Sequence, residues 1–400
     1  MKAIAIAAIL SACVTASLGA QDTSSVPVDT SYVEYHESPI GLPLGIGLRV
    51  PSYDRVNGVT LPWGPRLDLG EDKLQVDALV SYRSNLGKWD PSLEGTAHPG
   101  QTNEIKLYVG RGTFTNDSWI RSDLVNSFAA LFVGSDARNY YRGDRATLRV
   151  GHSLTKGSLE VTPFIGGNLE RDWSTGSLAP VKTPWSFFGR TGVLRMRRPN
   201  PTISKGRINS MIGGSALEFV QQAFEAKLDA SVEHAFKAPS FSCSSAVPLP
   251  ACTNEPFTQT TIHSTVKFPT FGTQKFEFLG HAVLAGGDPL PPQRFAYLGG
   301  AGTLATVNLL ALGGDNLLYV QGDYTIPINI IQLPFVGGPF VALRYAAGNA
   351  GVGRIPPLIQ NVGVAVGVGP LRVDYAIDPA SNRNPLSRRS AVTFGVSLPL

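Results

Sequence analysis

Apolar and polar side chains alternate along much of this chain, most clearly from Phe224 to Phe236. The even positions of that stretch are apolar apart from His234, and its odd positions begin with Glu225, Lys227 and Asp229. A strand places successive side chains on opposite faces, whereas a helix would scatter these charges around its circumference. The stretch therefore predicts a strand with one apolar and one charged face.

The same period of two recurs from Leu74 to Arg83 and from Ile105 to Val109. Further strand candidates begin near Arg145, Ser158, Ser186, Asn209, Thr258, Thr273, Asn316, Phe340, Asn361 and Leu371. Apolar residues facing lipid and charges facing a lumen would explain all of them. Longer stretches rich in polar residues, Gly and Pro predict external loops at Gly87–Thr102, Ser118–Asp144, Arg171–Pro184 and Pro239–Pro256.

The chain ends on a regular alternating segment, from Ala391 to Leu400. In an outer-membrane barrel the last strand pairs with the first, so that no backbone edge is left open in lipid. A soluble all-β domain with a regular last strand is the alternative interpretation. On the barrel interpretation, five apolar side chains face lipid: Val392, Phe394, Val396, Leu398 and Leu400.

Composition narrows the fold class. Charged residues make up only 16% of the chain, which argues against disorder, and 43 Gly and 30 Pro argue against a helical protein. After the N-terminus, the longest apolar window is interrupted by Pro327, Pro334 and Pro339, which excludes a helical membrane span. The sequence predicts an all-β protein, a closed antiparallel transmembrane β-barrel of about 16 strands, within a range of about 14–16.

The first residues are typical of an export signal. Lys2 precedes an apolar run from Ala3 to Leu10, and small residues continue to Ala20. We therefore expect a signal peptide at 1–20, a linker or lumenal tail at 21–51, and a barrel at 52–400 in the outer membrane of a Gram-negative bacterium. Cys13 also lies in a sequence of the lipoprotein type, so lipidation there is the alternative.

Two cysteines remain after ordinary cleavage, Cys243 and Cys252. An even number in an oxidising compartment favours a disulfide over two free thiols. The pair would tether an external loop.

Two segments near the end of the chain carry a family resemblance. The first runs from Leu290 to Gly300 and contains Arg294, Phe295 and the pair Gly299 and Gly300. The second opens the penultimate strand with Gly369, Pro370, Arg372 and Asp374. In this order they resemble the C-terminal half of the bacterial surface antigen superfamily, which includes BamA and TamA. The resemblance implies a sixteen-stranded outer-membrane barrel, the barrel-assembly machinery as a partner during biogenesis, and a role in envelope biogenesis or protein translocation.

The chain departs from the family pattern in the loop that follows the glycine pair. The family's loop usually carries an Arg-Gly-aromatic tip, and here Ala305 takes the place of that arginine. The stretch that usually supplies its acidic partner, Arg344–Asn349, has no carboxylate. The periplasmic POTRA repeats are also missing. The resemblance therefore supports the fold more strongly than the assembly activity.

The remaining chemistry favours a protein without catalytic, cofactor or metal sites. The six His are scattered and form no ligand pair, and no nucleophile is marked by neighbouring residues. The small net charge of +4 leaves no footprint for nucleic acid, so outer-membrane lipids are the expected surroundings. A passive or gated channel is the second interpretation, because inward charges such as Glu225, Lys227, Asp229 and Glu233 suit a water-filled interior. An enzyme is the third.

Overall fold

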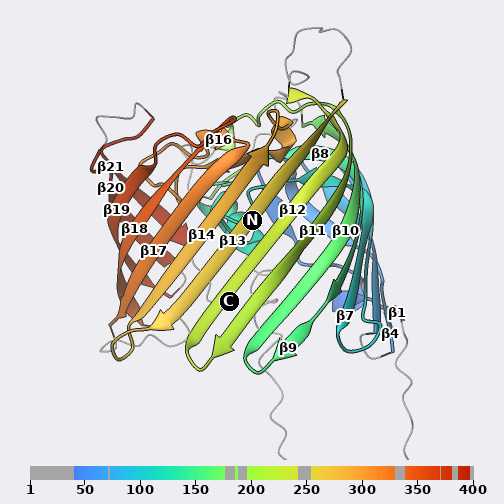
Figure 1. Ribbon diagram of the computed structural model, residues 1–400, viewed down its shortest axis with the longest axis horizontal. Helices are drawn as coiled ribbons and strands as arrows, with labels where there is room; N and C mark the ends of the chain where they lie inside the picture. The colour runs from blue at the N-terminus through green and yellow to red at the C-terminus, as the bar shows by residue number, and fades with distance from the viewer. Residues whose placement is uncertain are drawn as a thin grey trace, which may run out of the picture. The chain divides into compact units, whose positions relative to one another are not determined.

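The computed structural model describes residues 40–70, 73–175, 185–187, 196–241, 254–328, 338–369, 371–380 and 386–396. Most of these residues belong to one antiparallel sheet of 19 strands (Figure 1). In chain order its strands are β1 (Ile40–Gly41), β2 (Ser52–Asp54), β3 (Gly58–Trp63), β4 (Arg66–Leu69), β5 (Leu74–Arg83), β6 (Lys88–Ala97), β7 (Asn103–Phe114), β8 (Tyr141–His152), β9 (Leu154–Lys156), β10 (Leu159–Ser174), β11 (Gly206–Gln221), β12 (Phe224–Pro239), β13 (Asn254–Pro269), β14 (Lys275–Gly286), β17 (Asn316–Pro327), β18 (Pro339–Gly351), β19 (Ile359–Val368), β20 (Leu371–Ile377) and β21 (Ser390–Val396). A separate two-stranded ribbon consists of β15 (Ala296–Leu298) and β16 (Leu312–Gly314).

The 19 strands correspond to sixteen antiparallel arms, because three arms are each recorded in two pieces. Strands β3 and β4 pair with β5 in one continuous register, and β8 and β9 do the same with β10. Strands β1 and β2 run along β4 and β3 as an irregular first arm. The described residues thus contain the large antiparallel sheet that the alternation predicts.

The most regular part of the sheet extends from β10 to β14, whose strands lie side by side in Figure 1. The strand expected from Phe224 is β12, and it pairs with β11 and β13 over nearly its whole length. Its apolar residues Val232 and Phe236 are exposed on one face, while Glu233 and Ala235 lie on the other. We call the face with the buried polar residues the inner face and the opposite, exposed and apolar face the outer face.

Connections differ in length between the two ends of the strands. One end has short turns, such as 157–158 and 222–223, and the other carries the long connections 115–140 and 287–315. These long connections fold over the inner face. Connection 115–140 contains helix α2 (Asp123–Phe128) and the π-helical turn η2 (Ala129–Val133), and 3-10 turns occur at η1 (Pro43–Gly45) and η4 (Pro292–Arg294). No helix among the described residues is both long and apolar enough to cross a membrane.

One local expectation from the sequence is wrong. The external loop expected at Gly87–Thr102 is mostly strand β6, because Trp89 and Leu93 alternate with charged neighbours around Pro91. The proline is tolerated since β6 pairs with β7 only from Ser92 onward. A strand was also expected to begin near Ser186. Residues 185–187 have no strand geometry, and the rest of that expected strand lies outside the described residues.

The first and last arms are only partly described. Strand β1 lies inside the segment 21–51 that the sequence assigned to a linker, and Leu48 bridges to Trp63. At the other end β21 pairs in register with β20, and Val392 and Phe394 are 59% and 60% exposed on the outer face. The expected signal peptide, Cys13, Cys243, Cys252, Leu398 and Leu400 lie outside the described residues, as does the side chain of Val396.

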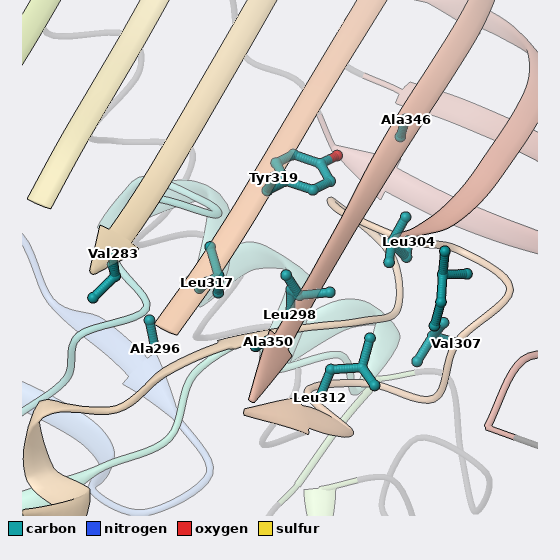
Figure 2. Close-up of a cluster of buried hydrophobic side chains, with 11 residues drawn as sticks. Val283, Ala296, Leu298, Leu304, Val307, Leu312, Leu317, Tyr319, Ala346 and Ala350 are labelled. Atoms are coloured by element: carbon teal, nitrogen blue, oxygen red, sulfur yellow. The ribbon is translucent and has the colours of Figure 1, made fainter. Parts of the chain in front are cut away.

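The largest hydrophobic core lies on the inner face, where connection 287–315 packs against β14, β17, β18 and β19 (Figure 2). Leu298 and Leu304 from the connection are fully buried against Leu317 and Tyr319 of β17. Full burial of a Leu side chain contributes about 1.5–3 kcal/mol. Packing alone therefore holds this connection firmly on the sheet.

Candidate functional site

The candidate site is connection 287–315 between β14 and β17, which we call the inner loop. It enters through the turn η4 and the ribbon β15–β16, and its central part turns back at residues 299–311. Pro291 and Pro292 fix the backbone where η4 begins, because a proline suits the first position of a helical turn. The base of the loop is residues 290–295, and its tip is residues 303–308.

Arg294 joins the base to two strands of the large sheet, which we call the wall where the inner loop packs against it. Its Nη1 and Nη2 donate to the two carboxylate oxygens of Glu170 on β10, at 3.2 and 2.9 Å. Its Nε and Nη2 donate to the carboxylate of Glu233 on β12, at 2.8 and 3.0 Å. Planar guanidinium–carboxylate pairs of this kind are among the strongest hydrogen bonds in proteins.

The charges in this cluster are buried together. Burial by itself would lower the pKa of Arg294, but the charges of Glu170 and Glu233 outweigh it and raise that pKa well above its usual value. Arg145 of β8 lies 3.2 Å from Glu170, so two cations face two carboxylates. A buried cluster tolerates its charges only when they are paired and hydrogen-bonded.

Neutral hydrogen bonds extend the base to three further elements. The side chain of Gln293 exchanges two bonds with the backbone of Ser204, at 2.9 and 3.2 Å. Asn116 donates to the carbonyl oxygen of Gln293 at 2.6 Å, and Gln259 of β13 donates to that of Arg294 at 2.8 Å. The base is thus bonded to strands and connections from five parts of the chain.

The glycine pair shapes the loop between base and tip. Gly299 and Gly300 have φ angles of 122° and 82°, which favour glycine. A Cβ on Gly299 would lie 2.3 Å from the carbonyl oxygen of Asn308, so the returning strand of the loop could not pass. The sharp turn expected at this pair is confirmed.

The tip is held to a different part of the wall. The backbone N–H of Thr306 donates to Asn361 of β19 at 3.1 Å, and the Asn361 amide donates back to the Thr306 hydroxyl at 2.8 Å. The same hydroxyl lies 3.0 Å from that of Ser387, and Val307 forms a β-bridge with Ser387. The inner loop therefore connects the β10–β12 wall with the β19 wall and the connection after β20.

Ala305, the residue in the place of the family's arginine, lies beside a charged part of the wall. A narrow cavity next to it is lined by Arg344 of β18 and Asp374 of β20. Arg344 pairs with Asp323 of β17 at 2.6 Å, and Arg372 pairs with Asp374 at 2.6 Å. The strands beside the tip therefore supply both the cations and the carboxylates of these ion pairs, and the inner loop supplies neither.

A second buried carboxyl lies next to the base. Asp117, in connection 115–140, accepts a hydrogen bond from the Asn139 backbone at 2.7 Å and is close to Tyr297. Burial raises its pKa to about 7, and the Asn139 bond and the charge of Arg198 oppose this only in part. Unlike Glu170, Asp117 forms no ion pair among the residues that the structure describes.

The structure brings together some of the residues singled out in the sequence. Arg294 and Phe295 lie at the base, whereas Ala305 and Asp374 line one cavity near the tip, and Arg372 pairs with Asp374. Gly369 lies in the turn before β20, and Pro370, like the two cysteines, is outside the described residues.

Sequence reasoning missed the acidic partners of Arg294. Glu233 was recognised only as an inward charge, and Glu170 was not singled out at all. It also missed a stack on the inner face, in which the ring of His281 lies 4.2 Å from that of Trp119 and 5.6 Å from that of His263. Glu170, His263 and His281 lie at inner-face positions of their strands, and that alternation was the available signal in the sequence.

A solved structure shares this fold. BamA from Haemophilus ducreyi lacking POTRA domains 1–3 matches 86% of this chain and 68% of its own, at 14% identity and a TM-score of 0.53. The match to CdiB from Escherichia coli covers 90% of this chain and 62% of the CdiB chain, at 11% identity and a TM-score of 0.49. No family model and no curated protein matches the sequence. The chain thus shares its fold with this BamA structure.

Proposed function

We propose that this chain is an outer-membrane β-barrel protein that takes part in envelope biogenesis by assembling or translocating other proteins. The observation that carries the proposal is the inner loop, which is fixed at its base to β10 and β12 and at its tip to β19. A passive porin needs a continuous water path through its lumen. A loop bonded at both ends across the inner face would obstruct such a path.

The location in the outer membrane is supported by the outer face of the sheet. Apolar side chains are exposed there on strand after strand, for example Leu148, Ile165, Met211 and Val364. This is the pattern of a surface in contact with lipid. An exported protein with such a face would be inserted by the barrel-assembly machinery.

We include closure of the barrel in the proposal. The segment α2–η2 contacts both β2, in the first arm, and β21, in the last. The two ends of the sheet therefore lie near the same segment, and pairing between them would leave no backbone edge in lipid. Cross-linking of cysteines placed in the first arm and in β21 would test this pairing.

Conductance in a planar bilayer separates the proposal from a channel. We expect low, unsteady conductance from the unchanged protein, and a clear increase for Arg294→Ala, which frees the base of the inner loop. Lys227→Ala is the matched control, because its ion pairs with Glu218 and Glu225 are exposed. A large, steady conductance of the unchanged protein would overturn the proposed function.

Assembly can be measured directly with purified components. Liposomes with and without the protein receive an unfolded small outer-membrane barrel, and its folding is followed by the shift in gel mobility before boiling. We expect faster folding when the protein is present. Equal rates, together with no protection of a secreted substrate from external protease, would leave the biogenesis role without support.

A passive or gated channel is the second candidate. It is favoured by the exposed charges at the short-turn end of the inner face, where Lys227 and Glu218 are each 47% exposed. These groups suit a water-filled entrance. Release of the inner loop would then act as the gate.

A further inference from the structure

A row of charged residues crosses the outer face near the end of the strands that carries the long connections. Arg111 on β7 is directly opposite Asp144 on β8, which is opposite Arg171 on β10, which is opposite Arg207 on β11. All four belong to the outer face, where Val109, Leu148, Leu169 and Met211 nearer the middle of the same strands are apolar and exposed. Charged side chains on such a face require an explanation.

Positive charge dominates this row. Arg111 donates two hydrogen bonds to Asp144, at 2.6 and 3.0 Å, and so occupies the single carboxylate of the row. Arg171 and Arg207 are exposed and form no ion pair with any residue that the structure describes. Like charges directly opposite each other destabilise a pair of strands. An anion bound between the two arginines would remove that repulsion.

A β-bulge adds a further cation. The register between β11 and β12 shifts at Asn209 and Ser210, and Lys237 is paired with Asn209 beyond the shift. Both Phe236 and Lys237 are exposed as a result. Bulges change the direction of a side chain in this way. Lys237 lines the same shallow groove as Arg171 and Arg207.

The row lies at the boundary of the apolar belt. Val109 and Leu169 lie two residues nearer the middle of their strands than Arg111 and Arg171. Both are exposed and line the same groove. On the other side, the guanidinium of Arg111 lies 5.6 Å from the ring centre of Trp173. Aromatic residues mark the level of the headgroups in outer-membrane barrels. The cations are therefore at the height of lipid phosphates, above a surface for acyl chains.

We propose that this groove binds a phosphorylated lipid of the outer leaflet, of the lipid A type. Arg171 and Arg207 hold a phosphate group between them, since the guanidinium fork matches phosphate oxygens in a bidentate geometry. Lys237 adds a third positive charge, and an acyl chain lies along Val109 and Leu169. This site is independent of the inner loop, and it rests on the outer-membrane location in the proposed function but not on the assembly activity.

The test uses the purified full-length protein in detergent with lipid A as the probe, and native mass spectrometry counts the retained lipid. Arg171→Gln/Arg207→Gln should bind at least about tenfold more weakly. Lys227→Gln/Lys267→Gln removes the same charge from the inner face and should bind like the parent. The gel shift on boiling verifies that each variant is folded. Equal retention by the two double variants would overturn the proposal.

Two ligand comparisons on the unchanged protein complete the test and do not depend on any variant. Lipid A from which the phosphates have been removed should be retained much less than intact lipid A, and equal retention would contradict a phosphate site. Inorganic phosphate at the same concentration should fail to displace lipid A, because it lacks acyl chains. Displacement would reduce the groove to a site for free phosphate and overturn the lipid assignment.

Discussion

At its base the inner loop contributes a cation, Arg294, to two glutamates of the wall, whereas at its tip it contributes the small Ala305. The charges of the sheet beside the tip are already balanced, since Arg344 pairs with Asp323 of the neighbouring strand and Arg372 pairs with Asp374 of its own strand. The base is therefore held by ion pairs in which the loop supplies the cation and the strands supply the carboxylates. The tip is held by neutral hydrogen bonds and packing.

This difference has a consequence for how the loop can move. Lifting the base would leave Glu170 and Glu233 buried without Arg294, and a buried charge that loses its partner is costly. Lifting the tip breaks the bonds of Thr306 but leaves the ion pairs of the wall intact. The loop is therefore anchored at its base and releasable at its tip.

The largest expected effect is that of Arg294→Ala. It should lower the free energy of unfolding by about 3–5 kcal/mol, because Glu233 loses its cation and Glu170 keeps only Arg145. Urea titration in detergent, followed by the gel shift on boiling, measures this. Lys227→Ala, which removes an exposed ion pair, should cost less than about 1 kcal/mol. Similar losses in the two variants would contradict the anchoring role of the base.

Asp117 adds a pH dependence to the base. Its folded pKa is about 7 against an ordinary value of 3.8, so the folded protein keeps the proton at pH values where the unfolded chain has lost it. Stability should therefore fall by roughly 3 kcal/mol as the pH rises from about 4 to about 7. Asp117→Asn should remove this component from urea titrations. An unchanged pH profile in that variant would exclude Asp117 as its source.

The tip can be tested by moving the arginine from wall to loop. Ala305→Arg should destabilise, because a third arginine enters beside Arg344, and Arg344→Ala should destabilise by leaving Asp323 with less compensation. Combined, the new side chain replaces the lost charge, and the double-mutant cycle should show a favourable coupling of about 2 kcal/mol. Strict additivity would mean that the tip and this network do not interact.

The smallest effect is expected for Thr306→Val. It removes the hydroxyl that contacts Asn361 and Ser387 but keeps the backbone bonds, at a cost of about 0.5–1.5 kcal/mol. Hydrogen exchange of the amides in 303–308 should become faster, while that of 290–295 stays unchanged. Thr303→Val is the control, since the Thr303 hydroxyl bonds within the loop to Gly299. Faster exchange at the base as well would show that the two ends open together.

Much of the sheet could be predicted because alternation is local. The residues from Phe224 onward contain the period of two that makes β12, and the separation of Glu233 from Val232 onto opposite faces follows from it. Strand β6 was missed because Pro91 and Gly95 obscured the same period. The turn at Gly299 and Gly300 was predictable since it depends on the backbone freedom of those two residues.

The sequence by itself determined which residues form strands, which face each side chain takes, and where the inner loop begins. Only the tertiary structure decided the partners. Arg294 meets Glu233 and Glu170 across separations of 61 and 124 residues. Ala305 lies near Arg344 because the whole inner loop folds over the inner face. The direction of a side chain follows from the period of its own strand. The identity of its neighbour depends on how distant strands and loops are brought together, and no local pattern specifies that.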